Sequence, residues 1–376
     1  MKIIVATDSF KGCLSAETAS KTIADAIVEQ LPKAQILTKP LADGGEGTAN
    51  AMIAACNGRW IPRKVMGPLP NMEVDAGFAW FEKTRTVLVE MACASGITLL
   101  SKDQLNPLKT TTYGTGQLIA AALEKLPYEI LLAIGGSATV DMGVGAAMAL
   151  DWQFLDSNGK SVGLGGECLE RIEKIIPPPK LPDCRVKVLS DVTNSLYGQN
   201  GAAEVFGPQK GANPQTVKRL DAAIKRLSGL IRDKLNIDVS DISGGGAAGG
   251  LGAGAAAFMN ADIVSGIETI ISVINLKKDL TDADWIITGE GRFDNQSLGG
   301  KVISGIVRLA RQTNTKVAVI AGDVQVSKSE YKKFGVIDAI GLKKNNMTTD
   351  YAMQNCVKLL IDASREFVKI IKNEAD

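Results

Sequence analysis

The chain has 376 residues, which is enough for at least one complete hydrophobic core and predicts two domains. Its 42 Lys and Arg residues balance 41 Asp and Glu residues, and this net charge of +1 gives no electrostatic reason to expect a nucleic acid or an anionic membrane as partner. The chain has no histidine, which excludes Ser-His-Asp hydrolases and His-ligated zinc sites. Any chemistry must come from carboxylates, Lys, Arg, hydroxyls and backbone dipoles, and these groups suit phosphoryl transfer.

The cysteines and the N-terminus predict a cytoplasmic protein. The six cysteines are scattered and never form C-x-x-C, as is typical of free thiols in a reducing cytosol. The apolar run at the N-terminus is short and soon reaches Asp8, so we expect no export signal. We find no apolar run long enough for a transmembrane helix.

Two strand–loop–helix units open the chain. Residues 2–7 form an apolar run typical of a buried parallel strand, and the polar loop 8–12 leads into a helix capped by Ser15. Residues 36–40 predict a second strand, and the glycine-rich loop 41–48 precedes a second helix. Each polar loop therefore follows the carboxyl end of a strand.

The middle of the chain has a different pattern. Residues 59–66, 73–81 and 86–91 predict an antiparallel meander, which marks the entry into a second domain. Later strands at 129–134 and 185–189 each end in polar residues that could meet a ligand.

Residues 244–252 formally contain G-x-G-x-x-G, but they do not follow an obvious strand. We interpret them as a close-packed helix start, with backbone N–H groups that bind a phosphate as the alternative.

Strand–helix units return after Asp284, with strands at 285–288, 316–321 and 336–340. Two units before the middle and three after it predict a flavodoxin/Rossmann-like, doubly wound parallel α/β sheet. An inserted mixed α/β domain would interrupt this sheet, with a cleft between the two domains.

The predicted domains are residues 1–64 with 282–376, and residues 65–281. In the strand order 2-1-3-4-5, the switch point lies between the first and third strands. The loops 8–12 and 289–294 would then face one another.

Four charged residues lie among glycines after the third strand of this sheet: Glu290, Arg292, Asp294 and Lys301. A flexible backbone with both charge signs could hold a phosphorylated, metal-bound anion. A solvated turn with internally paired charges is the alternative interpretation.

Six motifs, taken together and in order, resemble the bacterial type 1 glycerate kinases over nearly the whole chain. They are D-S-F-K-G at 8–12, L-A-D-G-G-E-G-T at 41–48, N-P-L-K-T-T-T-Y-G-T-G at 106–116, I-G-G-S-A-T at 134–139, V-F-G-P-Q-K-G at 205–211 and T-G-E-G-R-F-D at 288–294. The resemblance implies two α/β domains and phosphorylation of D-glycerate by ATP with Mg²⁺, with 2-phosphoglycerate as the expected product.

The chain departs from the family pattern at a few positions. Thr7 stands where the pattern has proline, Thr193 replaces an aspartate, and Val140 and Met142 replace an asparagine and a glycine. The last two could alter substrate preference or affinity if their loop touches a ligand.

For catalysis we predict Asp191 and Lys11. Asp191 would orient and deprotonate the glycerate hydroxyl, and its alternative role is a helix cap or loop brace. Lys11 would neutralise a transferring phosphate or the substrate carboxylate. Ser9 and Ser137 have no histidine to activate them, so nucleophilic catalysis is not expected.

The remaining predicted site residues are acids, glycines, hydroxyls and one arginine on these loops. The predicted substrate-binding residues are Asp8, Ser9, Asp43, Gly44, Gly45 and Arg292. The predicted metal ligands are Glu290, Asp294 and Glu46. The predicted nucleotide-phosphate residues, which precede helices, are Gly114, Thr115, Gly116, Gly135, Gly136, Ser137 and Thr139.

Other functions stay open at this stage. A kinase of the same family could give 3-phosphoglycerate, and a non-catalytic protein could bind a small acid without nucleotide. A nicotinamide dehydrogenase and a P-loop NTPase are disfavoured because their glycine fingerprints are missing. The oligomeric state is open, with a homodimer as one candidate.

Overall fold

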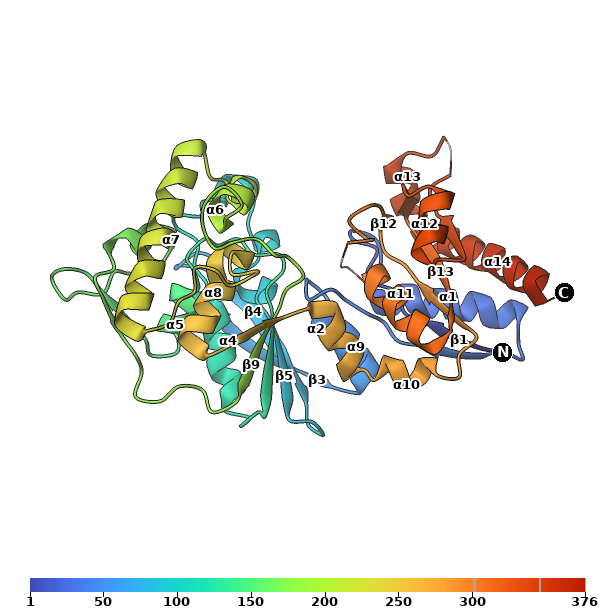
Figure 1. Cartoon of the computed structure of the whole chain (residues 1–376), viewed down its shortest axis with the longest axis horizontal. Helices are drawn as coiled ribbons and strands as arrows, with labels where there is room; N and C mark the ends of the chain where they lie inside the picture. Colours follow the sequence, from blue (N-terminus) through green and yellow to red (C-terminus); the bar gives the residue numbers. More distant parts are fainter. Residues whose placement is uncertain (300–301, 345, 376) are drawn as a thin grey trace. The chain divides into compact units, whose positions relative to one another are not determined.

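The computed structural model describes residues 1–299, 302–344 and 346–375, and it divides the chain into two compact units (Figure 1). The first unit contains Met1–Asp43, Asn50–Asn57 and the chain from Ile267 onward; the second contains Gly44–Ala49 and Gly58–Gly266. Both units are mixed α/β, as predicted. The units change at Asn57 and Gly266, whereas the predicted boundaries lie at residues 64 and 281. The strand β3 (Arg59–Met66) runs unbroken through residue 64.

The first unit is built on one parallel sheet. Its strands are β1 (Lys2–Val5), β2 (Gln35–Thr38), β11 (Trp285–Thr288), β13 (Lys316–Ala321) and β15 (Asp338–Gly341). They lie in the order β15-β13-β11-β1-β2, and every pairing is parallel. This order is 2-1-3-4-5 in chain sequence, so the predicted topology is confirmed.

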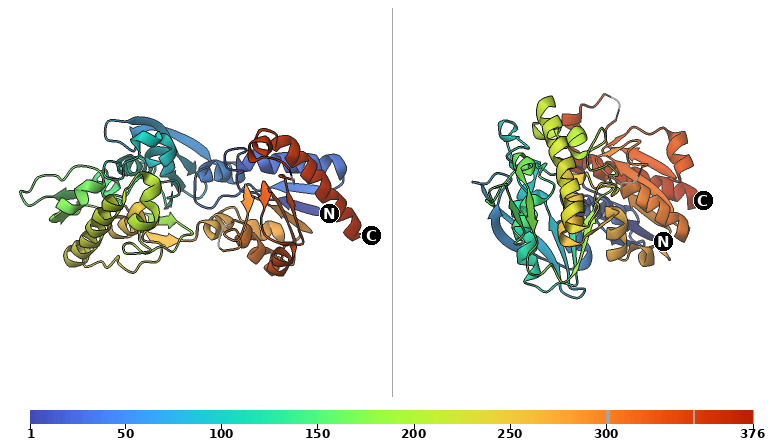
Figure 2. Two further views of the ribbon diagram at one scale, coloured as in Figure 1. Left: turned by 90° about the horizontal axis from the view of Figure 1, so that it is seen from above. Right: turned by 60° about the vertical axis from the view of Figure 1, so that its left-hand side comes forward.

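Helices cover this sheet. They are α1 (Ala16–Gln30), α2 (Thr48–Cys56), α9 (Gly266–Val273), α10 (Leu276–Leu280), α11 (Val302–Thr313), α12 (Lys328–Phe334), α13 (Thr349–Gln354) and α14 (Cys356–Ala375), with a small parallel pair of β12 (Arg292–Phe293) and β14 (Asp323–Val324). Figure 2 shows α14 (red) beside α1 (blue). Ile23 and Ile27 of α1 share one buried cluster with Leu360 and Phe367 of α14. The aromatic rings of Phe367 and Trp285 pack edge to face, with 5.4 Å between their centroids.

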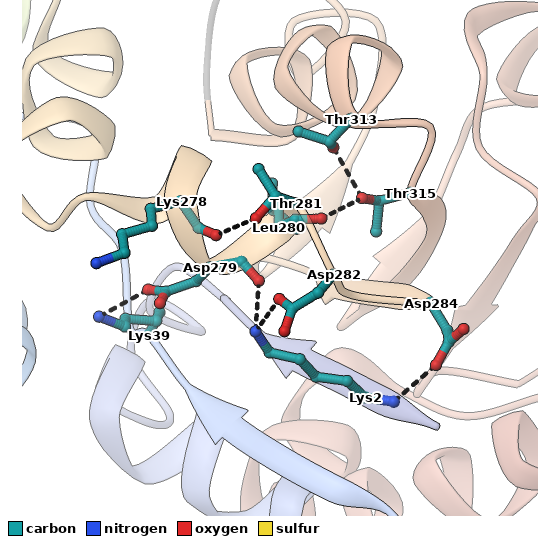
Figure 3. Close-up of polar contacts among 10 residues, drawn as sticks. All are labelled: Lys2, Lys39, Lys278, Asp279, Leu280, Thr281, Asp282, Asp284, Thr313 and Thr315. Carbon is teal, nitrogen blue, oxygen red and sulfur yellow. Dashed lines mark hydrogen bonds and ion pairs between the residues drawn. The ribbon is translucent and has the colours of Figure 1, made fainter.

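Polar contacts hold the segment that brings the chain back into the first unit (Figure 3). Lys2 Nζ donates to the Asp279 carbonyl at 2.8 Å and pairs with Asp282, and the Lys2 N–H donates to Asp284 Oδ2 at 2.7 Å. Lys39 Nζ lies 3.0 Å from Asp279 Oδ2. These bonds join α10 and the start of β11 to β1 and β2.

The second unit has a six-stranded mixed sheet in the order β10-β9-β6-β5-β4-β3. The strands are β3 (Arg59–Met66), β4 (Glu73–Phe81), β5 (Thr86–Glu90), β6 (Glu129–Ala133), β9 (Arg185–Leu189) and β10 (Asp262–Val264), with a separate hairpin of β7 (Gln153–Leu155) and β8 (Lys174–Ile176). β3, β4 and β5 pair antiparallel, which confirms the predicted meander. The other pairings in the large sheet are parallel.

The helices of the second unit include one long amphipathic helix, α7, labelled in Figure 1. The helices are α3 (Ala92–Ser95), α4 (Tyr113–Leu123), α5 (Val144–Met148), α6 (Ala202–Phe206), α7 (Pro214–Leu235) and α8 (Ala247–Met259), with 3-10 turns η1 (Ile97–Leu99), η2 (Lys102–Gln104), η3 (Gly166–Arg171) and η4 (Pro208–Lys210). Asn213 Oδ1 caps α7 by accepting from the Thr216 N–H at 2.8 Å. Across the described residues, no helix is both long and apolar enough to cross a membrane.

The glycine-rich segment before and within α8 packs closely against neighbouring backbone. Ala248, Gly249 and Gly250 have positive φ values of 54°, 68° and 89°. A Cβ at Gly249 would lie 2.0 Å from the Thr139 carbonyl oxygen. The interpretation of this segment as a close-packed helix start is therefore confirmed.

Gly249→Ala should lower the free energy of unfolding by about 3 kcal/mol or more, because the new methyl group meets backbone and the left-handed conformation disfavours a side chain. Gly229→Ala is the matched control, because Gly229 lies in α7 with nothing within 4 Å of a new Cβ. That change should raise stability by up to about 1 kcal/mol. Urea unfolding of both variants tests the pair; equal stabilities would contradict the packing role.

Candidate functional site

Loops that follow three neighbouring strands of the first unit lie side by side at the carboxyl edge of the sheet. The Asp8 N–H donates to the Gly289 carbonyl at 2.8 Å, which joins the loop after β1 to the loop after β11. The Gly322 N–H, after β13, donates to the Glu290 carbonyl at 3.1 Å. The prediction that loops 8–12 and 289–294 face one another is confirmed.

A group of carboxylates is concentrated at this edge. Asp8 is buried, and its Oδ1 accepts from the Ser9 N–H at 2.6 Å. Burial, followed by repulsion from Asp43, raises the pKa of Asp8 from 3.8 to about 7; Glu290 adds to the rise, whereas the Ser9 bond and the charge of Lys11 oppose it. The native fold thus places two acidic groups, Asp43 and Glu290, where each disfavours the ionisation of Asp8.

This donor set fits Mg²⁺. No group of three or more Cys, Asp or Glu side chains among the described residues is arranged to hold a metal ion unaided. Mg²⁺, however, usually takes only one or two carboxylates together with waters and phosphate oxygens. A divalent cation would relieve the repulsion around Asp8, so Asp8 and Glu290 have suitable chemistry.

The other two predicted metal ligands are placed differently. Asp294 Oδ1 accepts from the Gln296 N–H at 2.8 Å and the Ser297 N–H at 3.3 Å, which turns its own loop. Glu46 is exposed and belongs to the second unit. Burial raises the pKa of Glu90, and the charge of Glu46 adds to that rise. The assignments of Asp294 and Glu46 to a metal stay predictions. Lys301 lies outside the described residues.

Lys11 and Arg292 line one cavity of about 100 Å³ in the first unit. Lys343 and Asp323 line it as well, although the sequence analysis did not select them. Both residues follow strands of the same sheet, β15 and β13, so the rule that ligands bind at carboxyl strand ends could have found them. The cavity combines three cationic side chains with one carboxylate, which suits a small anion.

Two predicted loops of the second unit touch each other. The Gly135 N–H donates to the Gly44 carbonyl at 3.4 Å, and a Cβ at Gly135 would lie 2.6 Å from the Gly45 Cα. Gly44 and Gly136 have φ values of +86° and +74°, a conformation that favours glycine. The structure therefore brings together glycines that were predicted to bind substrate and glycines that were predicted to bind nucleotide.

Ser137 and Thr139 are buried in this second loop. Lys210 Nζ donates to Ser137 Oγ at 2.6 Å and to the Thr139 carbonyl at 2.8 Å. Lys210 belongs to the motif V-F-G-P-Q-K-G at 205–211, but no site role was predicted for it.

Gly114, Thr115 and Gly116 occupy the interior of the second unit. A Cβ at Gly114 would lie 1.8 Å from the Met66 carbonyl oxygen, and one at Gly116 would lie 2.3 Å from the Ala146 carbonyl oxygen. The Thr115 hydroxyl bonds to Ser95 Oγ at 2.8 Å. These contacts favour a packing role, and the assignment of the three residues to phosphate is not supported by their burial.

Asp141 is a buried carboxylate that the sequence analysis also missed. Its Oδ2 accepts from the Thr112 N–H at 2.8 Å and the Thr112 hydroxyl at 2.9 Å, while Oδ1 accepts from the Gly143 N–H at 3.2 Å. Burial raises the pKa of Asp141, although these bonds oppose the rise. Asp141 thereby fixes the loop after β6 against the start of α4.

Asp191 follows β9 and is half-buried. Its Oδ1 accepts from the Ser265 hydroxyl at 2.8 Å and from the N–H of Gly266, the first residue of α9, at 3.1 Å. These bonds fit the alternative role of a helix cap, and they leave the predicted catalytic role to experiment.

Val140 and Met142 are fully buried in the core of the second unit. They do not line the loop surface, so the expected direct effect on a ligand is not supported by their positions.

The comparisons with known proteins agree with this architecture. A family model described as the glycerate kinase family matches residues 3–372. The chain belongs to the glycerate kinase family. The chain is 40% identical to glycerate 2-kinase of Escherichia coli, over 97% of this chain and 96% of that protein. It is 38% identical to glycerate kinase of Halalkalibacterium halodurans, over 98% and 97% of the two chains.

A solved structure has the same fold. The crystal structure described as a glycerate kinase 2 from Salmonella typhimurium LT2 matches with a TM-score of 0.89 at 39% identity, covering 100% of this chain and 99% of that one. The resemblance carried by the six motifs is confirmed, and membership of this family makes the chain an enzyme of the kinase class.

Asp8→Asn should stabilise the protein at pH 8 when EDTA removes divalent cations. The native state binds the Asp8 proton more tightly than the unfolded state, so this contribution to stability is present below pH 4 and is lost as the pH rises towards 7. The gain should reach about 2–4 kcal/mol at pH 8 and disappear near pH 4. Urea unfolding across this range is the measurement.

Asp25→Asn is the control for this experiment, because Asp25 is an exposed carboxylate in the same unit, paired with Lys21. Its effect should stay within about 0.5 kcal/mol at every pH. A less stable Asp8→Asn protein at pH 8 would show that Asp8 is not held against repulsion.

Proposed function

We propose that the chain transfers the γ-phosphoryl group of ATP to a hydroxyl of D-glycerate, with Mg²⁺, and forms 2-phosphoglycerate and ADP. The observation that carries this proposal is the joining of the loops after β1 and β11, which gathers Asp8, Glu290, Lys11 and Arg292 at the switch point of the first unit. Family membership supplies the substrate class, and the similar E. coli protein is named a glycerate 2-kinase.

The first unit would hold the metal and the acid. Asp8 and Glu290 are our assigned Mg²⁺ ligands, and the ion would neutralise charge on the phosphate oxygens of the nucleotide. The Ser9 N–H holds Asp8 by a hydrogen bond, and the ion would offset the repulsion between Asp8 and Asp43. Lys11 and Arg292 would bind the glycerate carboxylate. Arg292 would do so through two parallel N–H···O hydrogen bonds.

The second unit would hold the phosphates of the nucleotide. Gly135, Gly136, Ser137 and Thr139 form a loop after β6 whose backbone conformation is fixed by glycine and by buried hydrogen bonds. Gly44 and Gly45 pack on this loop, and our assignment places them in the same anion site. Backbone N–H groups in such loops are suitable donors to phosphate.

Asp191 is the proposed base. The glycerate hydroxyl would lose its proton to the Asp191 carboxylate as its oxygen bonds to the γ-phosphorus and the bond from that phosphorus to the β–γ bridging oxygen breaks. A positioned base contributes about 10² to 10⁴-fold to such a step. The absence of histidine makes a carboxylate the natural choice.

A coupled ADP-release assay with D-glycerate, ATP and Mg²⁺ should detect turnover, and phosphorus NMR should identify 2-phosphoglycerate. Asp191→Asn should lose about 10²-fold or more in kcat, because asparagine caps a helix as well as aspartate does but cannot take a proton. Asp191→Ala removes both abilities and should also lose stability.

The outcomes separate the alternatives. Full activity of Asp191→Asn would reduce Asp191 to a capping residue and move the search for the base to Asp8 or Asp294. A 3-phosphoglycerate signal would change the acceptor hydroxyl. Glycerate binding without nucleotide binding or turnover would favour a protein that only binds a small acid.

Arg292→Lys should raise KM for D-glycerate about 10- to 100-fold and leave KM for ATP within about twofold, because lysine cannot form the bidentate contact. Arg308→Lys is the control, since Arg308 forms an exposed ion pair with Glu268 in the same unit. Equal changes in both KM values would argue against a carboxylate role for Arg292. Steady-state kinetics with each substrate varied gives the result.

A further inference from the structure

Lys210 is a buried lysine of the second unit. Its side chain is 1% exposed, although lysine is almost never fully buried without an ionic partner. Its described hydrogen bonds are to Ser137 Oγ at 2.6 Å and the Thr139 carbonyl at 2.8 Å, and none of the described ion pairs includes it. Both acceptors belong to the loop that we assign to phosphate.

The backbone around Lys210 is hydrogen-bonded and closely packed. Lys210 ends η4, its N–H donates to the Gly207 carbonyl at 3.0 Å, and Gly211 follows with φ +93°. A Cβ at Gly211 would lie 2.2 Å from the Leu105 carbonyl oxygen. The tight packing at Gly211 holds the turn that carries Lys210, whose side chain is buried.

The loop that receives Lys210 is built from several directions. The Ala138 N–H donates to the Ser95 carbonyl at 2.9 Å, and the Thr110 hydroxyl donates to the Ala138 carbonyl at 2.9 Å. The Ile97 N–H donates to the Gly136 carbonyl at 2.8 Å. In contrast, the Thr139 hydroxyl is fully buried and has no hydrogen-bond partner among the described residues.

Two observations argue against a purely structural lysine. The first is the burial of a lysine itself. A neutral side chain could satisfy the neighbouring hydroxyl and carbonyl, and an apolar side chain of similar volume is often as stabilising as a buried charge. The second is the unpartnered Thr139 hydroxyl in the same loop, since buried polar groups are usually satisfied by protein, water or ligand. A retained buried cation beside an unsatisfied donor points to an anion.

We propose that Lys210 is a positioning residue for the nucleotide phosphates, which fixes Ser137 and Thr139 from behind the loop and places a positive charge there. This inference rests on the proposed function, because it assumes that residues 135–139 bind phosphate. Lys210 acts through the loop and is not assigned to touch the reacting atoms.

A proton should accompany the anion. Burial lowers the pKa of Lys210 from 10.5 to about 7, and Asp141 is the charged side chain that acts against this shift. Asp141 belongs to the segment after the loop and is itself fully buried, with a raised pKa. The Lys210 amine can therefore gain or lose a proton near neutral pH, and a nearby phosphate would favour its charged form.

The test is calorimetric titration of MgADP into the native protein and into Lys210→Met at pH 7.5, in two buffers of different ionisation enthalpy. Lys210→Met should weaken MgADP binding about tenfold or more. In steady-state kinetics, its KM for D-glycerate should change less than twofold. The native protein should take up about 0.3–0.8 more protons per site than Lys210→Met. Lys218→Met, an exposed lysine of α7, is the control and should match the native protein.

Two further variants keep the test decisive. Lys210→Arg retains a charge that does not titrate, so it should bind MgADP within about threefold of the native protein and show no extra proton uptake. Ser137→Ala removes one of the two acceptors and should weaken MgADP binding in the same direction. If Lys210→Met does not fold, the proton uptake of Lys210→Arg decides alone: uptake equal to that of the native protein would overturn the role of Lys210.

Three outcomes distinguish a wrong role for Lys210 from a wrong reaction. Unchanged MgADP affinity and proton uptake in Lys210→Met, with lower thermal stability, would make Lys210 a structural residue only. MgADP binding by the native protein without glycerate turnover would overturn the proposed reaction and leave Lys210 in place. A native protein that binds neither MgADP nor pyrophosphate would overturn both.

Discussion

The parallel pairing of β1 with β11 is the constraint on which the first unit depends. It joins residues about 280 positions apart, as the bond between the Lys2 N–H and Asp284 Oδ2 illustrates with a separation of 282. Loop-closure entropy grows only slowly with length, so an insertion that folds around its own core is tolerated. The same pairing sets the loop after β1 against the loop after β11. The anionic and cationic groups of the site therefore meet only once the chain has returned.

Burial replaces histidine as the source of groups that titrate near neutral pH. Desolvation raises the pKa of Asp8 and lowers the pKa of Lys210, and both pKa values reach about 7 from opposite sides. In each unit, then, a group with an ordinary pKa far from 7 is brought into the range where phosphate charge and proton transfer matter. Both shifts require a fold that keeps water away from the group, which no short motif can encode by itself.

The parts of the structure that follow from periodicity and chirality could be predicted from the sequence. Apolar runs located β11 and β13 to the residue, and the count of strand–helix units before and after the insertion gave the order of the first sheet. The contact between loops 8–12 and 289–294 followed from that order. The predicted boundary at residue 64 did not, because it cuts β3, which lies wholly in the second sheet.

Glycine and lysine gave weaker information about the site. A glycine that admits a ligand and a glycine that admits another backbone have the same sequence signature, so Gly114 and Gly116 resembled Gly135 until their neighbours were known. Lys210 and Asp141 were missed for a related reason. Their burial depends on contacts with residues far along the chain, such as Ser137 for Lys210 and Thr112 for Asp141.

The departure at Met142 changes packing while the backbone keeps a glycine-like conformation. Met142 has φ +51°, and Gly143 follows with φ +73°, so the left-handed turn persists with a methionine at a position where the family pattern has glycine. The strain of about 1–2 kcal/mol is offset by burying the methionine side chain, worth about 1.5–3 kcal/mol. Gly250 and Gly254 leave room for it, since a Cβ at Gly254 would lie 2.0 Å from the Met142 carbonyl oxygen. Any effect of this substitution on ligand preference must therefore pass through the backbone between Thr139 and Gly143, the same segment that Lys210 and Asp141 hold.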